Sequence, residues 1–434
     1  MAVPPSPAAR AAAMAIVHKL RKSGHIAYFA GGCVRDELLG LSPTDYDIAT
    51  DATPDRIQSL FKRTNQVGAA FGVILVTPTA DEGSPPSPSP ATVEVATFRA
   101  DGPYTDRRRP DIVTFSDPES DAKRRDFTVN SLFLDPDPET PSGSSVPRPS
   151  GKVIDFVGGR EDLARKLIRA VGDPEARLAE DHLRALRAVR FAARLGFQLD
   201  PATAQAIQRH ARDLQGVSRE RIGDEMRRML LHPTRAAATK LLESLSLDAP
   251  VLDEPSQQSP GSILAGLPER LAADGYPTCL AAWACDRGLS LDAVSVKSLL
   301  HRWRDALCLS NEERESLASA LEALSAIETS WQTLTTARQK RLAGAHPGFA
   351  AAMLLLSSRN ATIHKAIHHR VQDLLATPSG LSPEPLVTGD DLIAAGMTPG
   401  PSFRKALDLV YDAQLEDRIK TRAEALELAR RSGV

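Results

Sequence analysis

The stretch GGCVRDELLGLSPTDYDIAT (residues 31–50) brings together a double glycine, an Arg-Asp pair and two alternating aspartates. AYFA (residues 27–30), which precedes it, and DIAT, which closes it, are both typical of short strands. The glycine pair is expected to turn the chain into a helix that Gly40 ends. A glycine turn that opens a helix lets backbone N–H groups approach a phosphate, and Arg35 can add a charged fork. An ordinary structural turn is the alternative.

The acidic residues of this segment lie two apart. If the chain is extended there, Asp45 and Asp47 point to the same side, and two like charges held together favour a divalent cation. Such a pair suits two-metal displacement at phosphorus. In TVEVATF, Val93 and Val95 would face the core and Glu94 the opposite side, as a candidate third carboxylate. Solvated acidic residues on a loop and on an exposed strand face are the alternative interpretation.

A basic run follows further along the chain. Lys123, Arg124 and Arg125 precede Asp126, which we expect at the edge of a strand. Such a run is a candidate contact for a triphosphate or a ribose, although charge runs more often form solvated faces.

Composition limits the class of protein. The chain has 434 residues, 42% hydrophobic and 25% charged, which is typical of a soluble protein of several domains. The net charge of -2 argues against a general polyanion binder but leaves room for a local basic groove. The four cysteines form no Cys-x-x-Cys pair, so neither a disulfide framework nor a zinc site is indicated. We find no membrane span and no convincing export signal, and expect a cytoplasmic protein.

The pattern of apolar residues changes along the chain. Up to about residue 135, short apolar runs alternate with turns, and a helix with Thr53 as cap and Pro54 in its first turn lies between two of them. Pro/Ser-rich inserts at 81–90 and 135–151 are expected to be disordered extensions. After residue 155 the strand signals vanish. The sequence therefore predicts a small α/β head followed by a long helical part.

A helix is predicted across RLAEDHLRALRAVRFAARLGF (177–197). At about 100° per residue, one side carries a set of charged residues and the other an apolar set. The two sets are Asp181, Arg184, Arg187 and Arg190, and Leu178, Leu186, Val189 and Ala193. A carboxylate accepts and a guanidinium donates, whereas cytosine and adenine each present an amino donor beside a ring-nitrogen acceptor. An Asp–Arg pair can therefore accept C and A and reject U and G.

The motifs resemble one family when they are taken in order. The double glycine with Arg-Asp and Asp-x-Asp is followed by FGVILV (71–76), VEVATFR (93–99), YTDRRRPDIVTF (104–115), RRDFTVNSL (124–132), DFVGGREDL (155–163) and the segment 177–197. This order resembles class II tRNA nucleotidyltransferases and poly(A) polymerases over residues 24–230. LVTGDDLIAAGMTPGP (386–401) is similar to the C-terminal segment of many bacterial members.

The resemblance implies a role for each matching position. Asp45 and Asp47 match the family's metal-binding aspartates, and Glu94 matches a third carboxylate. The implied nucleotide contacts are Gly31, Gly32, Arg35, Arg124, Arg125 and Asp126. The motif that selects the incoming base is matched by Glu180, Asp181 and Arg184, with Arg187 and Arg190 behind it.

The resemblance also implies a fold and an activity. The fold is α+β: a nucleotidyltransferase palm of DNA polymerase beta type (1–155), then an all-α neck (156–230), body (231–375) and RNA-binding tail (376–434). The activity is template-independent addition of CMP, CMP and AMP, from CTP and ATP with Mg²⁺, to the 3′ end of tRNA, with release of pyrophosphate.

Three alternatives stay open: a poly(A) polymerase, an enzyme that adds only A, and an inactive RNA-binding protein. The tail lacks the polybasic block that would grip varied RNA ends. Residues 101–115 resemble a flexible loop that family members need for the terminal A. The first feature argues against a poly(A) polymerase, and the second favours an enzyme that adds all three nucleotides or A alone. The sequence does not indicate an oligomeric state.

Overall fold

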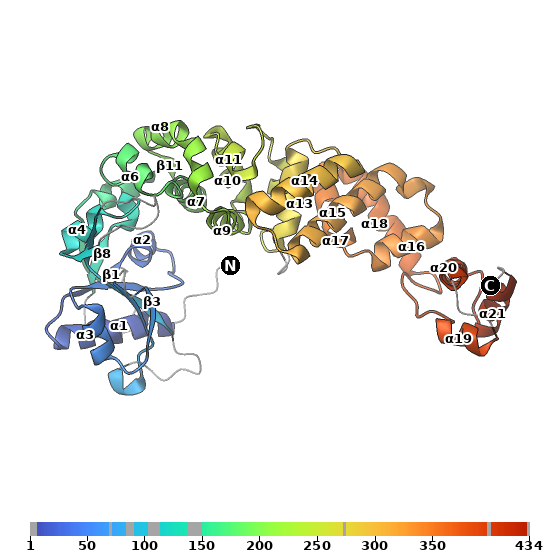
Figure 1. The fold of residues 1–434 in the computed structure, drawn as a ribbon, viewed down its shortest axis with the longest axis horizontal. Helices are drawn as coiled ribbons and strands as arrows, with labels where there is room; N and C mark the ends of the chain where they lie inside the picture. The colour runs from blue at the N-terminus through green and yellow to red at the C-terminus, as the bar shows by residue number, and fades with distance from the viewer. Residues whose placement is uncertain are drawn as a thin grey trace. The chain divides into compact units, whose positions relative to one another are not determined.

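The computed structural model describes residues 7–68, 72–83, 91–102, 113–136, 150–271, 275–396 and 401–431. The chain forms two compact units: residues 1–221 with 245–250, and residues 222–244 with 251–434. In Figure 1 the strands of the large sheet lie in the blue and cyan N-terminal part, and the yellow-to-red part is drawn as helices. This arrangement confirms the predicted α+β class.

The first unit is built on a seven-stranded mixed sheet with the order β3-β4-β5-β2-β1-β8-β9. Its strands are β1 (Ala27–Ala30), β2 (Asp47–Thr50), β3 (Thr64–Gly68), β4 (Val73–Val76), β5 (Val93–Thr97), β8 (Phe133–Pro136) and β9 (Gly151–Ile154). Strands β2 and β5 run parallel, and the other neighbours are antiparallel. A separate ribbon pairs β6 (Arg99–Asp101) with β7 (Val113–Phe115).

The two faces of this sheet are covered differently. Helix α1 (Pro7–Lys22) packs on β1, β2 and β5, and the Arg10 guanidinium lies 5.6 Å from the ring centroid of Phe29. Phe29 pairs with Ile48, and side chains of directly paired residues share a face. Ala30, which pairs with Asp47, lies on the other face in a cluster with Phe98 and Phe133. The face opposite α1 therefore carries Asp47.

Besides α1, the first unit contains further helices and short 3-10 turns. They are α2 (Gly32–Leu38), α3 (Pro54–Leu60), α4 (Pro118–Lys123), α5 (Gly159–Ala164), α6 (Pro174–Glu180), α7 (Arg184–Leu195) and α8 (Pro201–Arg209), with 3-10 turns η2 (Ala80–Glu82), η3 (Thr128–Asn130) and η4 (Ala211–Gly216). Thr53 occupies the N-cap position of α3, and Pro54 lies in its first turn, as the sequence predicts.

One expectation about the helical part was wrong. Strands β10 (Leu167–Ile168) and β11 (Gln198–Leu199) pair in parallel beyond residue 155. Each strand has two residues, too few to show the period-two alternation by which a strand is recognised in a sequence.

The rest of the chain is helical. Its helices are α9 (Arg219–Leu230), α10 (Arg235–Ser244), α11 (Asp248–Leu252), α12 (Ser262–Gly266), α13 (Gly275–Asp286), α14 (Ala293–Leu307), α15 (Asn311–Ser330), α16 (Thr336–Ala345), α17 (Phe349–Arg359), α18 (Ala361–Leu375), α19 (Gly389–Ala394), α20 (Pro401–Leu415) and α21 (Arg422–Arg431), with the 3-10 turn η5 (Trp331–Thr333). Helix α13 is buried along its described length, and its Trp283 ring lies 5.7 Å from that of Trp303.

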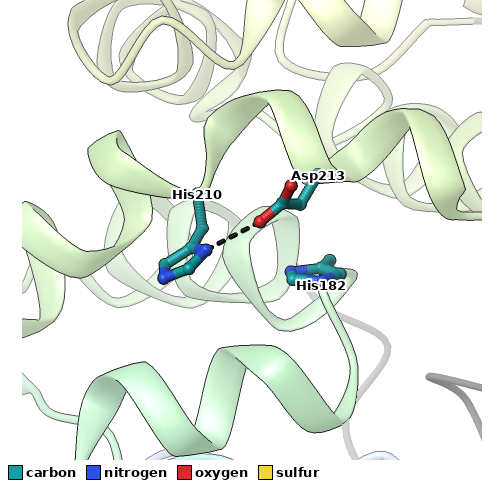
Figure 2. Close-up of side chains that lie close together, drawn as sticks. All are labelled: His182, His210 and Asp213. Carbon is teal, nitrogen blue, oxygen red and sulfur yellow. Dashed lines mark hydrogen bonds and ion pairs between the residues drawn. The ribbon is translucent and has the colours of Figure 1, made fainter. Parts of the chain in front are cut away.

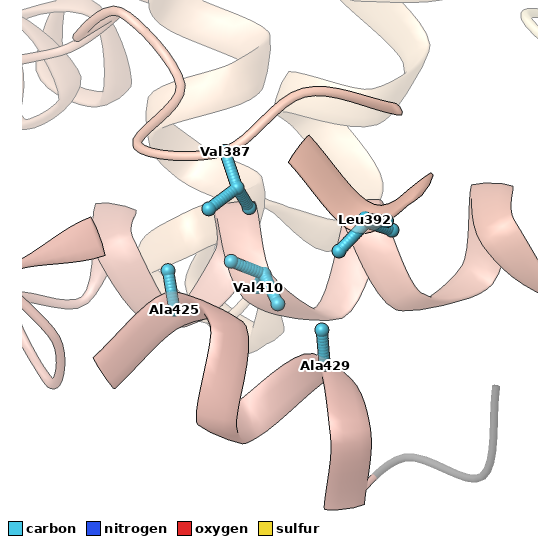
Figure 3. Close-up of a cluster of buried hydrophobic side chains, with 5 residues drawn as sticks. All are labelled: Val387, Leu392, Val410, Ala425 and Ala429. Carbon is cyan, nitrogen blue, oxygen red and sulfur yellow. The ribbon is translucent and has the colours of Figure 1, made fainter. Parts of the chain in front are cut away.

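The C-terminal helices share a small core. Val387, Leu392, Val410, Ala425 and Ala429 are buried together there (Figure 3). They come from α19, α20, α21 and the segment that precedes α19, so this part of the chain buries an apolar cluster of its own.

Some predictions fall outside the described residues. Residues 84–90 and 137–149, the greater part of the Pro/Ser-rich inserts, lie outside. So do residues 103–112, most of the predicted flexible loop. Residues 397–400 of the C-terminal motif are also outside. The division at residues 155, 230 and 375 stays a prediction. Within the described ranges, no helix is both long and apolar enough to cross a membrane.

Candidate active site

The acidic residues meet at the parallel pairing of β2 and β5. Asp47 and Glu94 are directly paired across these strands, and both side chains are exposed. Val93 and Val95, which flank Glu94, are buried, as period-two alternation requires. Glu94 therefore lies beside Asp47, on the side of the strand predicted from the sequence.

Asp45 lies just before β2 and is also exposed. Tyr46, between the two aspartates, turns the other way: it is 3% exposed, and its hydroxyl donates to Glu37 at 2.7 Å. Exposed, buried and exposed side chains at 45, 46 and 47 put both aspartates on the solvent side of an extended segment.

The electrostatics of Asp47 reflect this crowding. Desolvation by the surrounding protein raises the pKa of Asp47 to about 7, although the side chain keeps contact with solvent. The negative charges of Glu94 and Asp45 add to this increase, and Arg125 opposes it. Three carboxylates in mutual repulsion form a place where a cation is stabilised.

The double glycine forms the turn between β1 and α2. Gly31 has a φ of 73° and donates its N–H to the Leu132 carbonyl at 2.9 Å. A Cβ atom at this position would lie 2.9 Å from Nη1 of Arg125. The positive φ favours glycine here, and a Cβ would also force the end of the Arg125 side chain to shift. Gly32 is the first residue of α2.

Arg35 is held more firmly than the sequence suggests. It is 4% exposed and donates through Nε to Asp36 at 2.8 Å. Its Nη1 donates to the Asn130 side chain, and its guanidinium lies 5.2 Å from the ring centroid of Phe191. The side chain is thus a buried, oriented cation beneath the glycine turn.

Asp121 is a residue that the sequence reasoning missed. Its Oδ1 accepts from Arg124 at 2.9 and 2.6 Å, and its Oδ2 accepts from Arg125 at 3.1 and 3.0 Å. Burial alone would raise the pKa of Asp121, but these two guanidinium groups hold it below its ordinary value. The available signal was the i, i+3 and i, i+4 spacing to the two arginines.

The predicted strand edge at this basic run is a helix end instead. Lys123 is the last residue of α4, and Arg124 is its C-cap. The Asp117 side chain accepts the Ser120 N–H at 2.9 Å, and Pro118 follows it, a combination that starts a helix.

Asp126 links the head to helix α7. Its Oδ2 accepts from Nε and Nη2 of Arg187 at 2.8 and 2.6 Å, and its Oδ1 accepts from the Asn130 amide at 3.3 Å. Burial opposes its ionisation, but the charge and hydrogen bonds of Arg187 hold the pKa of Asp126 below its ordinary value. Two residues of the predicted site are therefore paired with each other.

The expectation of one helix across 177–197 was wrong. Helix α6 ends at Glu180, Asp181 is its C-cap with extended angles (φ −157°, ψ 102°), and α7 begins at Arg184. The Asp181 side chain accepts the Leu183 N–H at 3.1 Å. This local bond competes with helix continuation, which is the physical reason for the break.

The residues of the predicted selector are consequently held on different elements. Arg184 is 9% exposed and donates to the Arg177 carbonyl at 2.7 Å and to the Glu180 carboxylate. Asp181 accepts from Arg221 at 2.7 Å. On α7, Leu186, Val189 and Ala193 are buried as predicted, and the Arg190 guanidinium lies 4.4 Å from the Phe191 ring centroid.

Comparisons with known proteins place the chain in a family. Residues 27–169 match a poly A polymerase head domain, 196–258 an RNA- and SrmB-binding site of polymerase A, and 282–429 a tRNA nucleotidyltransferase domain 2. The CCA-adding enzyme of Bacillus pumilus is 34% identical over 435 residues, which cover 96% of this chain and 95% of that protein. The chain belongs to the CCA-adding enzyme family. The family resemblance seen in the sequence is thereby confirmed.

Other CCA-adding enzymes are similar to this chain in sequence or in fold. The CCA-adding enzyme of Geobacillus stearothermophilus is 34% identical, with 95% of both chains covered. The crystal structure of the Bacillus stearothermophilus CCA-adding enzyme in complex with CTP aligns with a TM-score of 0.74 at 29% identity, over 98% of each chain. The Thermotoga maritima CCA-adding enzyme complexed with tRNA aligns with a TM-score of 0.65 at 18% identity, over 97% of this chain and 94% of that one, and shows the shared fold.

Proposed function

We propose that the chain adds C, C and A, from CTP and ATP, to the 3′ end of tRNA and releases pyrophosphate. One observation carries this proposal: Asp47 and Glu94 are paired on parallel strands, in a chain that matches CCA-adding enzymes along 96% of its length. We propose that this occurs in the cytoplasm and that the helical part contacts the tRNA through its phosphates.

The three carboxylates at β2 and β5 (Asp45, Asp47 and Glu94) fit magnesium. Hard carboxylate oxygens are the ligands that Mg²⁺ prefers, and the negative charges of Glu94 and Asp45 lie close enough to act on Asp47. Asp45 and Asp47 would hold the ions, with Glu94 beside them. When bound, magnesium lowers the pKa of the attacking 3′ hydroxyl and neutralises the leaving pyrophosphate.

The triphosphate is proposed to bind at the glycine turn. There, Arg125 packs against Gly31 and is aligned with Arg124 by the shared Asp121 carboxylate. Guanidinium groups that are already oriented lose little entropy when they bind a phosphate. Arg35, fixed below the turn, adds positive charge without having to move.

Asp181 and Arg184 are proposed to select the base. The carboxylate of Asp181 can accept the amino group that C and A share, and Arg184 can donate to their ring nitrogen. Both side chains are preset by bonds to Arg221 and Glu180. A carboxylate has about four acceptor positions and a guanidinium has five N–H donors, so these bonds leave capacity for a base.

Sequencing of the products tests the activity. The full chain is incubated with magnesium, CTP, ATP and a tRNA transcript that lacks its 3′ end, and an unrelated RNA hairpin serves as the control. We expect C, C and A to be added in order to the tRNA, after which extension stops.

The other outcomes assign the alternatives. Long A tracts on both RNAs would instead assign a poly(A) polymerase, the activity for which the matched head-domain model is named. Extension only of tRNA that already ends in CC would assign an A-adding enzyme. No extension at all would assign an RNA-binding protein.

A further inference from the structure

Two histidines and an aspartate converge at a place away from the strands β2 and β5. His182 lies in the turn between α6 and α7, His210 at the end of α8, and Asp213 in η4 (Figure 2). One nitrogen of each ring and one carboxylate oxygen all lie within 4.8 Å of one another. The sequence reasoning missed this cluster because His182 is far from the other two along the chain.

The second ring nitrogen of His210 contacts a carboxylate. Nε2 of His210 lies 2.5 Å from the Glu175 carboxylate, while Nδ1 faces Asp213 at 2.7 Å. Glu175 is in turn bonded to Arg209. In metal sites, a ligating histidine almost always donates its other N–H to a carboxylate, a backbone carbonyl or water, which fixes the ring and its tautomer. Glu175 holds His210 in that manner.

We propose that His182, His210 and Asp213 form a binding site for a transition-metal ion of the zinc class. Imidazole nitrogens suit zinc, copper and nickel, whereas magnesium prefers oxygen ligands alone. Two neutral imidazoles and one carboxylate are a recurrent ligand set of zinc sites that keep an open fourth position. This site uses other residues and another ion class than the carboxylates at β2 and β5.

The geometry permits binding with small movements. Zinc–nitrogen and zinc–oxygen bonds of about 2.0–2.2 Å imply ligand separations of roughly 3.3 Å in a tetrahedral site. The present separations lie between 2.7 Å, for His210 and Asp213, and 4.8 Å. The side chains of His210 and Asp213 are 31% and 42% exposed, so they can rotate, and an ion can reach them from solvent. Binding replaces their hydrogen bond and releases its proton.

A bound ion would join three elements. His182 directly follows Asp181, so the ion would tie the turn between α6 and α7 to α8 and η4. Any effect on base selection would rest on the proposed role of Asp181. Ion binding itself does not rest on it, and the experiment therefore measures bound metal.

The test uses the full chain without a polyhistidine tag. The protein is stripped with a chelator and dialysed against zinc chloride in millimolar magnesium, and bound zinc is measured by mass spectrometry. We expect one tightly bound zinc per chain. His210→Asn and Asp213→Ala should each weaken binding more than 100-fold, and Glu175→Ala should weaken it about 10- to 100-fold, as the loss of an orienting carboxylate does.

Controls separate this cluster from other ligands. His364 and His368 lie one turn apart on α18, so the double variant His364→Ala, His368→Ala removes a competing histidine pair and should still bind one zinc. Circular dichroism confirms that each variant is folded. Cobalt in place of zinc should give the visible absorption of a tetrahedral site. The proposal is overturned if the parent chain binds no zinc, or if the His210 and Asp213 variants bind it as the parent does.

Discussion

The ion pair between Asp126 and Arg187 offers a direct test of how the head is tied to α7. Arg187→Ala removes two hydrogen bonds, of 2.8 and 2.6 Å, from the Asp126 carboxylate, whose side chain is 10% exposed in the parent protein. Removal of one partner of a buried ion pair costs about 3–5 kcal/mol of unfolding free energy. Because the Arg187 side chain is 33% exposed, solvent screening reduces our estimate to about 2–3 kcal/mol.

Hydrogen exchange is the appropriate assay because it reports this region locally. Amides of η3 and α7 should exchange roughly 30- to 150-fold faster in Arg187→Ala if they open together, since about 1.4 kcal/mol corresponds to a factor of ten. Arg194→Ala is the matched control, because Arg194 is an exposed arginine in the last turn of the same helix. A double-mutant cycle with Asp126→Asn isolates the coupling.

The pH dependence of stability provides a second test of the ion pair between Asp126 and Arg187. The pKa of Asp126 is lowered in the folded protein, so its contribution to stability is fully present above the ordinary value of 3.8. The contribution is lost as the pH falls below 3.8 through the lowered folded value. The stability difference between parent and Arg187→Ala should therefore shrink in acid. Equal exchange rates in Arg187→Ala and Arg194→Ala, or a difference that does not change with pH, would refute the reasoning.

Three further predictions concern the proposed reaction. Asp47→Asn should lower nucleotide incorporation at least 100-fold with tRNA affinity unchanged, because it removes a proposed magnesium ligand; near-normal turnover would contradict this role. In competition assays, Asp181→Ala and Arg184→Ala should each reduce discrimination against UTP and GTP by about 1–3 kcal/mol, the cost of one lost buried hydrogen bond. Unchanged selectivity in both variants would exclude the proposed role of these residues in base selection. Gly31→Ala should cost about 1–3 kcal/mol in thermal unfolding, because φ 73° and ψ −126° lie in a region that side chains disfavour. It should also raise the KM for nucleotide by displacing Arg125; an unchanged KM would show that Arg125 does not contact the nucleotide.

Features that depend on local pattern could be predicted from the sequence. AYFA is strand β1, residue for residue, and Glu94 faces away from Val93 and Val95. Alternation along a strand has a fixed period, so knowledge of which residues are buried also fixes where their neighbours point. The shared direction of Asp45 and Asp47 could be predicted from the sequence for the same reason.

Features that depend on tertiary contacts could not be predicted. Asp126 and Arg187 are separated by 61 positions, and Arg221 reaches Asp181 across 40. The break between α6 and α7 depends on whether the Asp181 carboxylate bonds its own backbone, a choice that the 100° periodicity of the segment does not reveal. Sequence reasoning therefore named Asp126, Asp181 and Arg187 but could not assign their partners.

These partners bear on the proposed nucleotide contacts, because the chain as a whole has a net charge of -2. Arg35, Arg124, Arg125, Arg184 and Arg187 each bond to a carboxylate of the same unit. Their four carboxylates offset most of the charge of these five arginines, yet each pairing fixes the direction of a guanidinium that would otherwise be mobile. The entropy of ordering these side chains is lost during folding rather than at nucleotide binding. In the proposed enzyme, the acidic residues Asp36, Asp121 and Asp126 thus contribute to nucleotide recognition through the arginines that they orient.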